Sequence, residues 1–294
     1  MAMELFLQQV ASGVVSGSIY ALIALGYVII YKATDVVNFA QGDLMMAGAY
    51  SGIVAYSLLG LPFGVALAAA VAVGTILGLA VGGTVSTMLV RFKSSLVNTI
   101  ILTLSIGIVL NSLAMLIFGP NPYPLPTSFG KEPIIVGGIR ITPLSLMIIA
   151  FSAVVMAALF AFFRYTWVGK AMRATAQNRD AASLMGIDVG RMFALSWTLG
   201  SVLGALGGVL LAPLIHAEPS MGIVAVKAFA AAIIGGFTSL PGAIVGGLLL
   251  GILENLAGGY LSMAFKDGIA YLVLGAILLV KPTGFFERQA VRRV

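Results

Sequence analysis

Arg164 to Arg191 reads R-Y-T-W-V-G-K-A-M-R-A-T-A-Q-N-R-D-A-A-S-L-M-G-I-D-V-G-R, the longest polar, charged passage in an otherwise apolar chain. Five of the 16 basic residues lie within it. It separates two regions that are each too hydrophobic to be soluble in water. Lys and Arg in short loops between membrane spans are retained on the cytoplasmic side. The passage is therefore expected to be a cytoplasmic loop.

A short helix is expected inside this loop, from Thr175 to Ile187. Asn178 can cap its start, and Gly186 can end it. Its apolar face is formed by Ala181, Ala182, Leu184 and Met185. A small amphipathic helix can rest on the membrane surface or dock into a groove of a partner. A basic loop that only sets topology needs no compact apolar face, so we interpret the helix as a plug whose partner supplies energy.

Composition places the whole chain in the membrane. Of its 294 residues, 60% are hydrophobic and 9% are charged, whereas a soluble domain carries about 25% charged residues. The expected fold is all-α: one transmembrane domain, residues 1–294, built as a bundle of about eight to ten transmembrane or re-entrant helices. The absence of cysteine excludes disulfides and thiolate metal sites. The N-terminus lacks the basic region of a cleavable signal peptide, so the first span is expected to remain.

Nine apolar segments are expected to lie in the membrane: Val10–Tyr31, Phe39–Leu59, Phe63–Val90, Val97–Phe118, Leu144–Phe163, Met192–Leu211, Val226–Phe237, Gly242–Leu256 and Gly268–Val280. The seventh is too short for a comfortable span of about 20 residues, so it is expected to be re-entrant or broken. Gly119–Pro143 is the main external loop, and Ile134–Ile141 predicts a hairpin within it. Twelve of the 16 basic residues fall inside this topology, with the N-terminus outside and the C-terminus cytoplasmic.

No catalytic set is visible in the sequence. His216 stands alone, without a cysteine or a carboxylate pair at metal-ligand spacing. No phosphate loop of the form G-x-x-x-x-G-K-[ST] is present, so any use of ATP must come from another subunit. We therefore expect neither a cofactor nor a metal, and no enzymatic activity of the chain itself.

Polar residues inside apolar segments are candidates for lining a translocation path, because they are costly in a membrane unless they face protein or water. The candidates are Asn38, Gln41, Asp43, Thr103, Asn111 and Glu254. Each also has a structural interpretation. The first three can satisfy backbone groups where a helix begins, and Thr103 and Asn111, with Ser105, can make hydrogen bonds between helices. Glu254 can be capped by Asn255 or by a lysine, while Lys227 is expected to snorkel to the outer interface.

Glycines recur at four-residue spacing in several segments: Gly13/Gly17, Gly48/Gly52, Gly74/Gly78/Gly82, Gly200/Gly204/Gly208, Gly242/Gly246 and Gly247/Gly251. Such rows create small faces on which helices approach closely. They indicate tight packing within one bundle, or alternatively faces that slide during transport.

Four motifs occur in order along the chain: G-S-I-Y-A-L-I-A-L-G-Y (Gly17 to Tyr27), V-V-N-F-A-Q-G-D-L-M-M-A-G-A-Y (Val36 to Tyr50), G-K-A-M-R-A-T-A-Q-N-R-D-A-A-S-L-M-G-I (Gly169 to Ile187) and A-A-I-I-G-G-F-T-S-L-P-G-A-I-V-G-G-L-L-L-G-I-L-E (Ala231 to Glu254). Together they resemble the permease subunits of branched-chain amino acid ABC importers, the Liv-H type. Related amide, urea and neutral amino acid permeases share much of this pattern.

The resemblance implies an ABC importer permease fold in a bacterial inner membrane. It also implies a second permease of the Liv-M type, two cytoplasmic ATPase subunits and a periplasmic binding protein that delivers the amino acid. The helix from Thr175 to Ile187 would then be the coupling helix seated on an ATPase. Its implied contacts are Ala176, Asn178, Arg179, Asp180, Ala181, Ala182, Leu184, Met185, Gly186 and Ile187.

Other functions remain open from the residues alone. The chain can be an ABC permease for urea, amides or other small solutes, or a stand-alone channel or ion-coupled carrier that uses Glu254 or Asp43. A scaffold without transport activity is a third possibility. Solute flux through the single chain without nucleotide would favour a carrier, and ATP hydrolysis by a complex with a loaded binding protein would exclude a scaffold.

Overall fold

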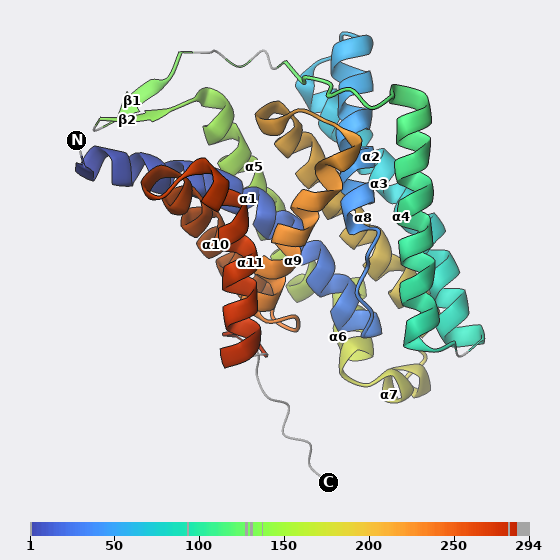
Figure 1. Ribbon diagram of the computed structural model, residues 1–294. Helices are drawn as coiled ribbons and strands as arrows, with labels where there is room; N and C mark the ends of the chain where they lie inside the picture. Colours follow the sequence, from blue (N-terminus) through green and yellow to red (C-terminus); the bar gives the residue numbers. More distant parts are fainter. Residues whose placement is uncertain are drawn as a thin grey trace.

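The structure is a computed structural model that describes residues 2–92, 94–126, 129, 132–136, 138–281 and 283–286. Several basic residues used in the topology prediction lie outside the described part, namely Lys93, Arg288, Arg292 and Arg293. The described part of the chain is mostly helical, with one small hairpin on its surface (Figure 1).

The first half contains α1 (Ala2–Thr34), α2 (Gln41–Ile53) with the π-helical turn Val54–Leu58, α3 (Phe63–Ser86) with the π-helical turn Thr87–Arg91, and α4 (Leu96–Phe118). The hairpin strands β1 (Ile134–Val136) and β2 (Ile139–Ile141) follow. The second half contains α5 (Pro143–Tyr165), α6 (Trp167–Gln177), α7 (Arg179–Leu184), α8 (Val189–Ile215), the 3-10 turn Pro219–Ile223, α9 (Val224–Gly235), α10 (Leu240–Tyr260) and α11 (Met263–Val280).

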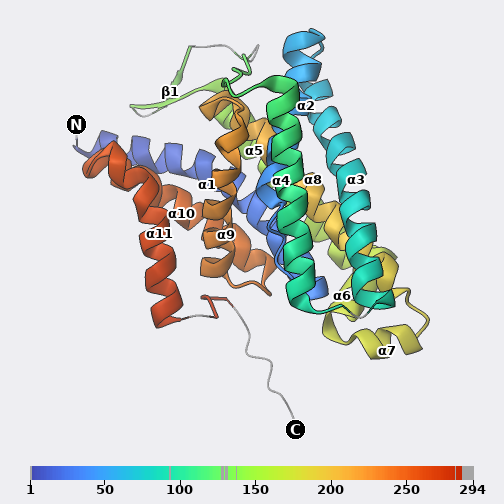
Figure 2. The ribbon, with the colours of Figure 1, turned by 45° about the vertical axis from the view of Figure 1, so that its right-hand side comes forward.

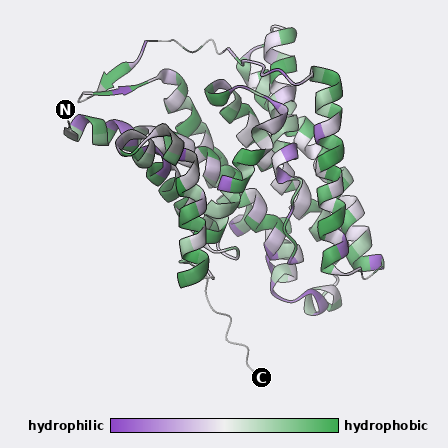
Figure 3. Cartoon of the chain, viewed as in Figure 1, coloured by the Kyte–Doolittle hydropathy of each residue, from purple (hydrophilic) through white to green (hydrophobic). Residues whose placement is uncertain are grey.

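Six helices of the described chain are long and apolar enough to cross a membrane: α1, α3, α4, α5, α8 and α10. Helices α1 and α8 form the inside of the bundle. In their most apolar stretches 89% and 72% of residues are buried, against 17% in both α4 and α5. Figure 2 shows α4 on the outside, and Figure 3 shows hydrophobic residues along most of its length. The outer helices therefore present apolar side chains to their surroundings, as a membrane requires.

Glycines allow the inner helices to touch backbone to backbone. On α1, a Cβ added at Gly13 or Gly17 would lie within 2.6 or 2.8 Å of α10 backbone atoms. On α3, a Cβ at Gly78 would lie 2.7 Å from the Thr198 Cα of α8. Gly48 of α2 meets the Ala205 backbone in the same way. The predicted close approach of small faces is confirmed.

Most predicted segments match the helices, but the eighth and the ninth are longer than predicted, and α11 begins at Met263 instead of Gly268. The seventh segment is α9, a helix of 12 residues preceded by a 3-10 turn, so its shortness is confirmed. The eighth was predicted as Gly242–Leu256, which is too short. Helix α10 has 21 residues and continues through Gly258 and Gly259, which lie beside the side chains of Lys266 and Gln9. The hairpin is confirmed, with Ile134 paired to Ile141.

Candidate functional site

Helices α6 and α7 lie at the end of the bundle where α1 ends (Figures 1 and 2). The prediction of one helix from Thr175 to Ile187 is wrong, because the segment is divided at Asn178. Thr175 to Gln177 belong to α6, which Thr166 caps by accepting a hydrogen bond from the Gly169 N–H at 3.0 Å. Nothing in the sequence around Thr175 interrupts that helix.

Asn178 ends α6 and starts α7. Its backbone is extended, with φ −156° and ψ 109°, so the helical hydrogen bonding of α6 stops there. Its side-chain oxygen accepts from the Ala181 N–H at 2.9 Å, which is the predicted cap. Gly186 follows with φ +81°, a left-handed conformation that glycine adopts without strain. The predicted start and stop residues of the short helix are therefore confirmed.

One face of α7 is anchored and the other is free. Ala182 is buried, and Arg179 forms an ion pair with Asp35 at 2.6 Å and a hydrogen bond to the Ala33 carbonyl at 3.3 Å. These contacts join α7 to the end of α1. Leu184 and Met185 are 89% and 82% exposed. Two large apolar side chains in water on one tethered turn are typical of a contact surface for another protein.

The remaining residues of the implied coupling set surround this turn. Asn178, Asp180, Ala181 and Gly186 are exposed, while Ala176, Arg179 and Ile187 are partly buried. Asp180 is in the first turn of α7, where a carboxylate is favoured by the helix dipole. The set thus forms one small surface with an apolar tip and polar flanks.

The link between α1 and α2 is built from buried amides. Asn38 and Gln41 are fully buried, and the Asn38 amide donates to Gln41 Oε1 at 3.1 Å. Asn38 Oδ1 accepts from the Ala40 N–H at 3.0 Å, and Gln41 Nε2 donates to the Gly200 carbonyl of α8 at 2.9 Å. Both side chains thus satisfy backbone groups where α2 begins and where α8 passes. This is the structural role that sequence reasoning considered for them.

A cavity of about 400 Å³ opens beside this link. Asp43 and Asn111 line it, together with the rings of Tyr27 and Phe229 and the turn Pro219–Ile223. Asn111 donates to the Pro219 carbonyl at 2.8 Å and so joins α4 to that turn. Asp43 is the only acidic residue among the described lining, and none of that lining is basic. The cavity is therefore mostly apolar, with one carboxylate and one amide near its wall.

Thr103 lies behind this wall and does not line the cavity. It is fully buried, donates to the Ile100 carbonyl at 2.9 Å, and accepts from the Phe39 N–H at 3.4 Å. Ser105 bonds only within its own helix, to the Ile101 carbonyl, among the contacts of the described residues. Hydrogen bonding between segments is thus found for Thr103 and Asn111, and not for Ser105. Sequence reasoning missed Pro219, Ser220 and Tyr27 as lining residues, because no local pattern brings the turn before α9 next to α4.

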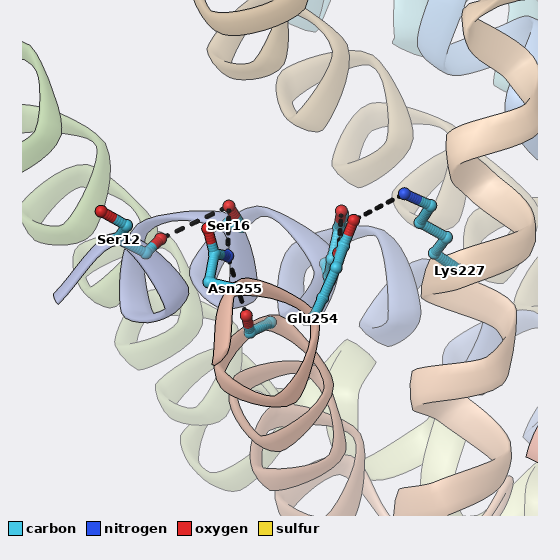
Figure 4. Close-up of polar contacts among 7 residues, drawn as sticks. Ser12, Ser16, Lys227, Glu254 and Asn255 are labelled. Atoms are coloured by element: carbon cyan, nitrogen blue, oxygen red, sulfur yellow. Dashed lines mark hydrogen bonds and ion pairs between the residues drawn. The ribbon is translucent and has the colours of Figure 1, made fainter. Parts of the chain in front are cut away.

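Glu254 lies apart from this cavity, in a second polar cluster (Figure 4). Its Oε1 is 2.6 Å from Lys227 Nζ, and the Tyr20 hydroxyl donates to its Oε2 at 2.6 Å. The prediction that Lys227 snorkels to the outer interface is wrong, since Lys227 is 7% exposed and points from α9 toward Glu254 on α10. Pairing removes the need to reach water.

Asn255 does not cap Glu254. Its amide donates to the Gly251 carbonyl at 2.9 Å and to Ser16 Oγ at 3.4 Å (Figure 4). Of the two capping partners considered for Glu254, the lysine is therefore confirmed and Asn255 is not. A pocket of about 600 Å³ borders the cluster and is also lined by Ser12, Ser145 and Lys266.

Comparison with known proteins gives consistent results over the whole chain. Residues 9–281 match the model of a family described as branched-chain amino acid transport system / permease component. The LivH permease protein of the high-affinity branched-chain amino acid transport system from Escherichia coli (strain K12) is 38% identical, over 98% of each chain. BraD of Pseudomonas aeruginosa, a permease protein of the same kind of system, is 33% identical, again over 98% of each chain.

Proposed function

The chain belongs to the family of branched-chain amino acid transport system permease components, and on that premise we propose that it carries leucine, isoleucine, valine or related hydrophobic amino acids through the membrane as one subunit of an ABC importer. It is a multi-pass membrane protein and a transport subunit, whereas ATP hydrolysis belongs to separate subunits. A partner permease and ATPases complete the importer.

We further propose specific partners and an orientation for the chain. A second permease of the Liv-M type shares the path, two ATPases lie on the cytoplasmic face, and a periplasmic binding protein delivers the amino acid. The N-terminus is outside and the C-terminus inside the inner membrane. This orientation is supported by basic residues at the α7 end of the bundle, including Lys32, Arg91 and Arg173, because such residues are retained in the cytoplasm.

The single observation that carries the coupling part of the proposal is the anchored, apolar tip of α7. We assign it to the ATPase contact, with Leu184 and Met185 as the residues that enter a groove of the partner and Asn178, Gly186 and Arg179 as those that hold the turn in place. The other flanking members of this surface are Ala176, Asp180, Ala181, Ala182 and Ile187. A short helix in a groove is a common way to join two proteins.

A chain of contacts connects this surface to the cavity. Arg179 holds Asp35 at the end of α1, and three residues later Asn38 bonds Gln41 at the start of α2. Asp43 then faces the cavity from the first turn of α2. When ATP closes the ATPase pair and displaces α7, these contacts transmit the movement to α2. One wall of the cavity then moves relative to α8. Alternating exposure of a central path follows from such rigid movements.

The cavity is the part of the chain that we assign to the translocation path. Asp43 and Asn111 face it, and Asn38, Gln41 and Thr103 hold its walls. Its apolar lining suits a branched aliphatic side chain, and the Asp43 carboxylate suits an ammonium group. Glu254 lines the pocket of about 600 Å³ and not this cavity. Its proposed contribution to the path is indirect: its ion pair with Lys227 holds α9, and residues of α9 line the cavity.

The experiment replaces one apolar residue at the tip of α7. The importer is reconstituted in vesicles with its partner permease, ATPases and binding protein, and ATP-driven leucine uptake is measured. Leu184→Asp places a charge in the proposed ATPase groove, so uptake is expected to fall at least about tenfold, the effect of 1.4 kcal/mol at one contact. Ser183→Asp is the matched control, because Ser183 is an exposed neighbour without an apolar side chain. Normal uptake by Leu184→Asp would remove α7 from the coupling step.

A further inference from the structure

A small basic pocket lies where α1 ends beside α6. Lys32, from the last turn of α1, and Arg173, from α6, line the same space of about 40 Å³. None of the described residues that line it is acidic, and neither cation forms an ion pair within the described part of the chain. The nearby Asp35 carboxylate is already held by Arg179 at 2.6 Å. Two like charges facing one space favour an anion between them.

An apolar groove of about 340 Å³ continues from this pocket along α1 and α5, toward the middle of their lengths. It is bounded by α1, α5 and the first turns of α10, through Leu25, Met156, Ala157, Phe160, Leu240 and Ile244. Leu240 lines both spaces. Ile29 of the basic pocket lies one turn beyond Leu25 on α1, and Phe163 lies about one turn beyond Phe160 on α5. The two spaces therefore follow one another along the same helices.

The groove opens to the outside of the bundle. Phe160 is 56% exposed, and Ala157 and Pro241 are exposed as well, while Leu25 forms a buried floor. Because α5 is one of the helices long enough and apolar enough to cross a membrane, the proposed site places this opening beside the acyl chains. An acyl chain can thus enter from the side, without passing through water.

We propose that the basic pocket and the apolar groove form one binding site for an anionic phospholipid of the cytoplasmic leaflet. The phosphate lies between the Lys32 ammonium and the Arg173 guanidinium, and one acyl chain lies in the groove. A space of about 40 Å³ holds a few water-sized groups, which suits the oxygens of a phosphate. Basic pockets between membrane helices on the cytoplasmic side are suited to such headgroups.

The position of this site gives the lipid a mechanical role. Arg173 is on α6, and α6 leads through Asn178 directly into α7. A phosphate held between Lys32 and Arg173 would join α6 to the end of α1, in parallel with the Arg179–Asp35 pair that joins α7 to the same end. The lipid would therefore help to hold α6 and α7 against the end of α1, on the side that faces the membrane.

Lipid binding to the full chain, purified in detergent with its partner subunits and stripped of lipid, tests the charged half of the site. Native mass spectrometry compares dioleoylphosphatidylglycerol with dioleoylphosphatidylcholine. Each cation near an anionic headgroup is worth about fivefold, so with two cations the anionic lipid is expected to bind about 25-fold more tightly. The double variant Lys32→Gln/Arg173→Gln should lose this preference. Arg164→Gln/Lys170→Gln removes the same charge from exposed positions outside the pocket and should retain it.

The groove is tested by filling it. Ala157→Trp is expected to weaken binding of the long-chain anionic lipid several-fold, while soluble glycerol phosphate competes poorly with that lipid at the wild-type site. Strong competition by glycerol phosphate would show a phosphate site without a lipid, and an equal loss in both double variants would show only general surface charge. Either result, or equal affinity of wild type for the two lipids, overturns the proposal.

Discussion

The inside of the bundle and the exposed turn α7 treat polar and apolar side chains in opposite ways. Inside, Glu254 and Lys227 are nearly without exposure, yet each charge has its partner within the chain, 2.6 Å away. On α7, Leu184 and Met185 project into solvent, and nothing else in the described chain covers them. The two buried charges are thus paired within the chain, whereas the apolar tip of α7 is left uncovered by the described residues.

This difference separates stability from function. A buried charge with a partner indicates a structural contact, because removal of the partner would leave a costly uncompensated charge. A large apolar side chain in water gains by burial, about 25 cal/mol for each Å² covered, and so indicates contact with another protein. Changes inside should therefore alter stability, and changes at the tip of α7 should alter transport.

The largest expected effect on stability comes from Lys227→Met. Among the described residues, the buried Glu254 carboxylate would then keep only the Tyr20 hydroxyl as a partner, so the free energy of unfolding should fall by about 3–5 kcal/mol. Thermal unfolding of the detergent-purified protein measures this loss. Lys227→Met/Glu254→Gln removes both charges and should recover most of it. A single variant that melts like the wild type would show that the pair contributes nothing.

A smaller effect is expected from one glycine on α3. A Cβ at Gly82 would lie 2.7 Å from the Ala194 carbonyl oxygen of α8, whereas a Cβ at its neighbour Gly83 would meet nothing within 4 Å. Gly82→Ala should lower stability by about 1–3 kcal/mol through overpacking. Gly83→Ala should leave stability unchanged or raise it by up to about 1 kcal/mol. Equal melting temperatures would contradict the close approach of α3 and α8.

The smallest effect is local to α7. Asn178→Ala removes the hydrogen bond to the Ala181 N–H and should destabilise the turn by about 1 kcal/mol. Hydrogen exchange at the α7 amides should then quicken about fivefold, while the melting temperature of the whole protein stays constant. Asn178→Asp keeps a capping oxygen and should exchange like the wild type. A large fall in melting temperature would place α7 inside the cooperative core.

Local patterns in the sequence predicted much of this structure. Asn178 and Gly186 marked the ends of the short helix, and glycine rows marked the faces where helices touch. The prediction of one helix from Thr175 to Ile187 missed α6, which runs through Thr175 to Gln177 and ends at Asn178. The fold as one domain and the roles of the coupling residues stay predictions.

Contacts between distant parts of the chain could not be predicted in this way. Tyr20 and Glu254 are 234 residues apart, and Arg179 and Asp35 are 144 apart. No spacing rule connects such residues, because only the packing of the helices brings them together. The turn before α9 meets Asn111 for the same reason. The sequence identified Asn111 and Glu254 as polar residues that are costly in a membrane, but not the distant residues that they contact.

The central claim, that an ATPase binds the tip of α7 in the cytoplasm, is tested most directly with a single thiol. The chain contains no cysteine, so Leu184→Cys places one reactive group on the exposed turn. In inside-out vesicles from cells that make the whole importer, a short thiol cross-linker should join this residue to an ATPase subunit. In intact cells a membrane-impermeant maleimide should not reach it. Labelling from outside the cell, or a thiol that cross-links to no ATPase, would contradict the account.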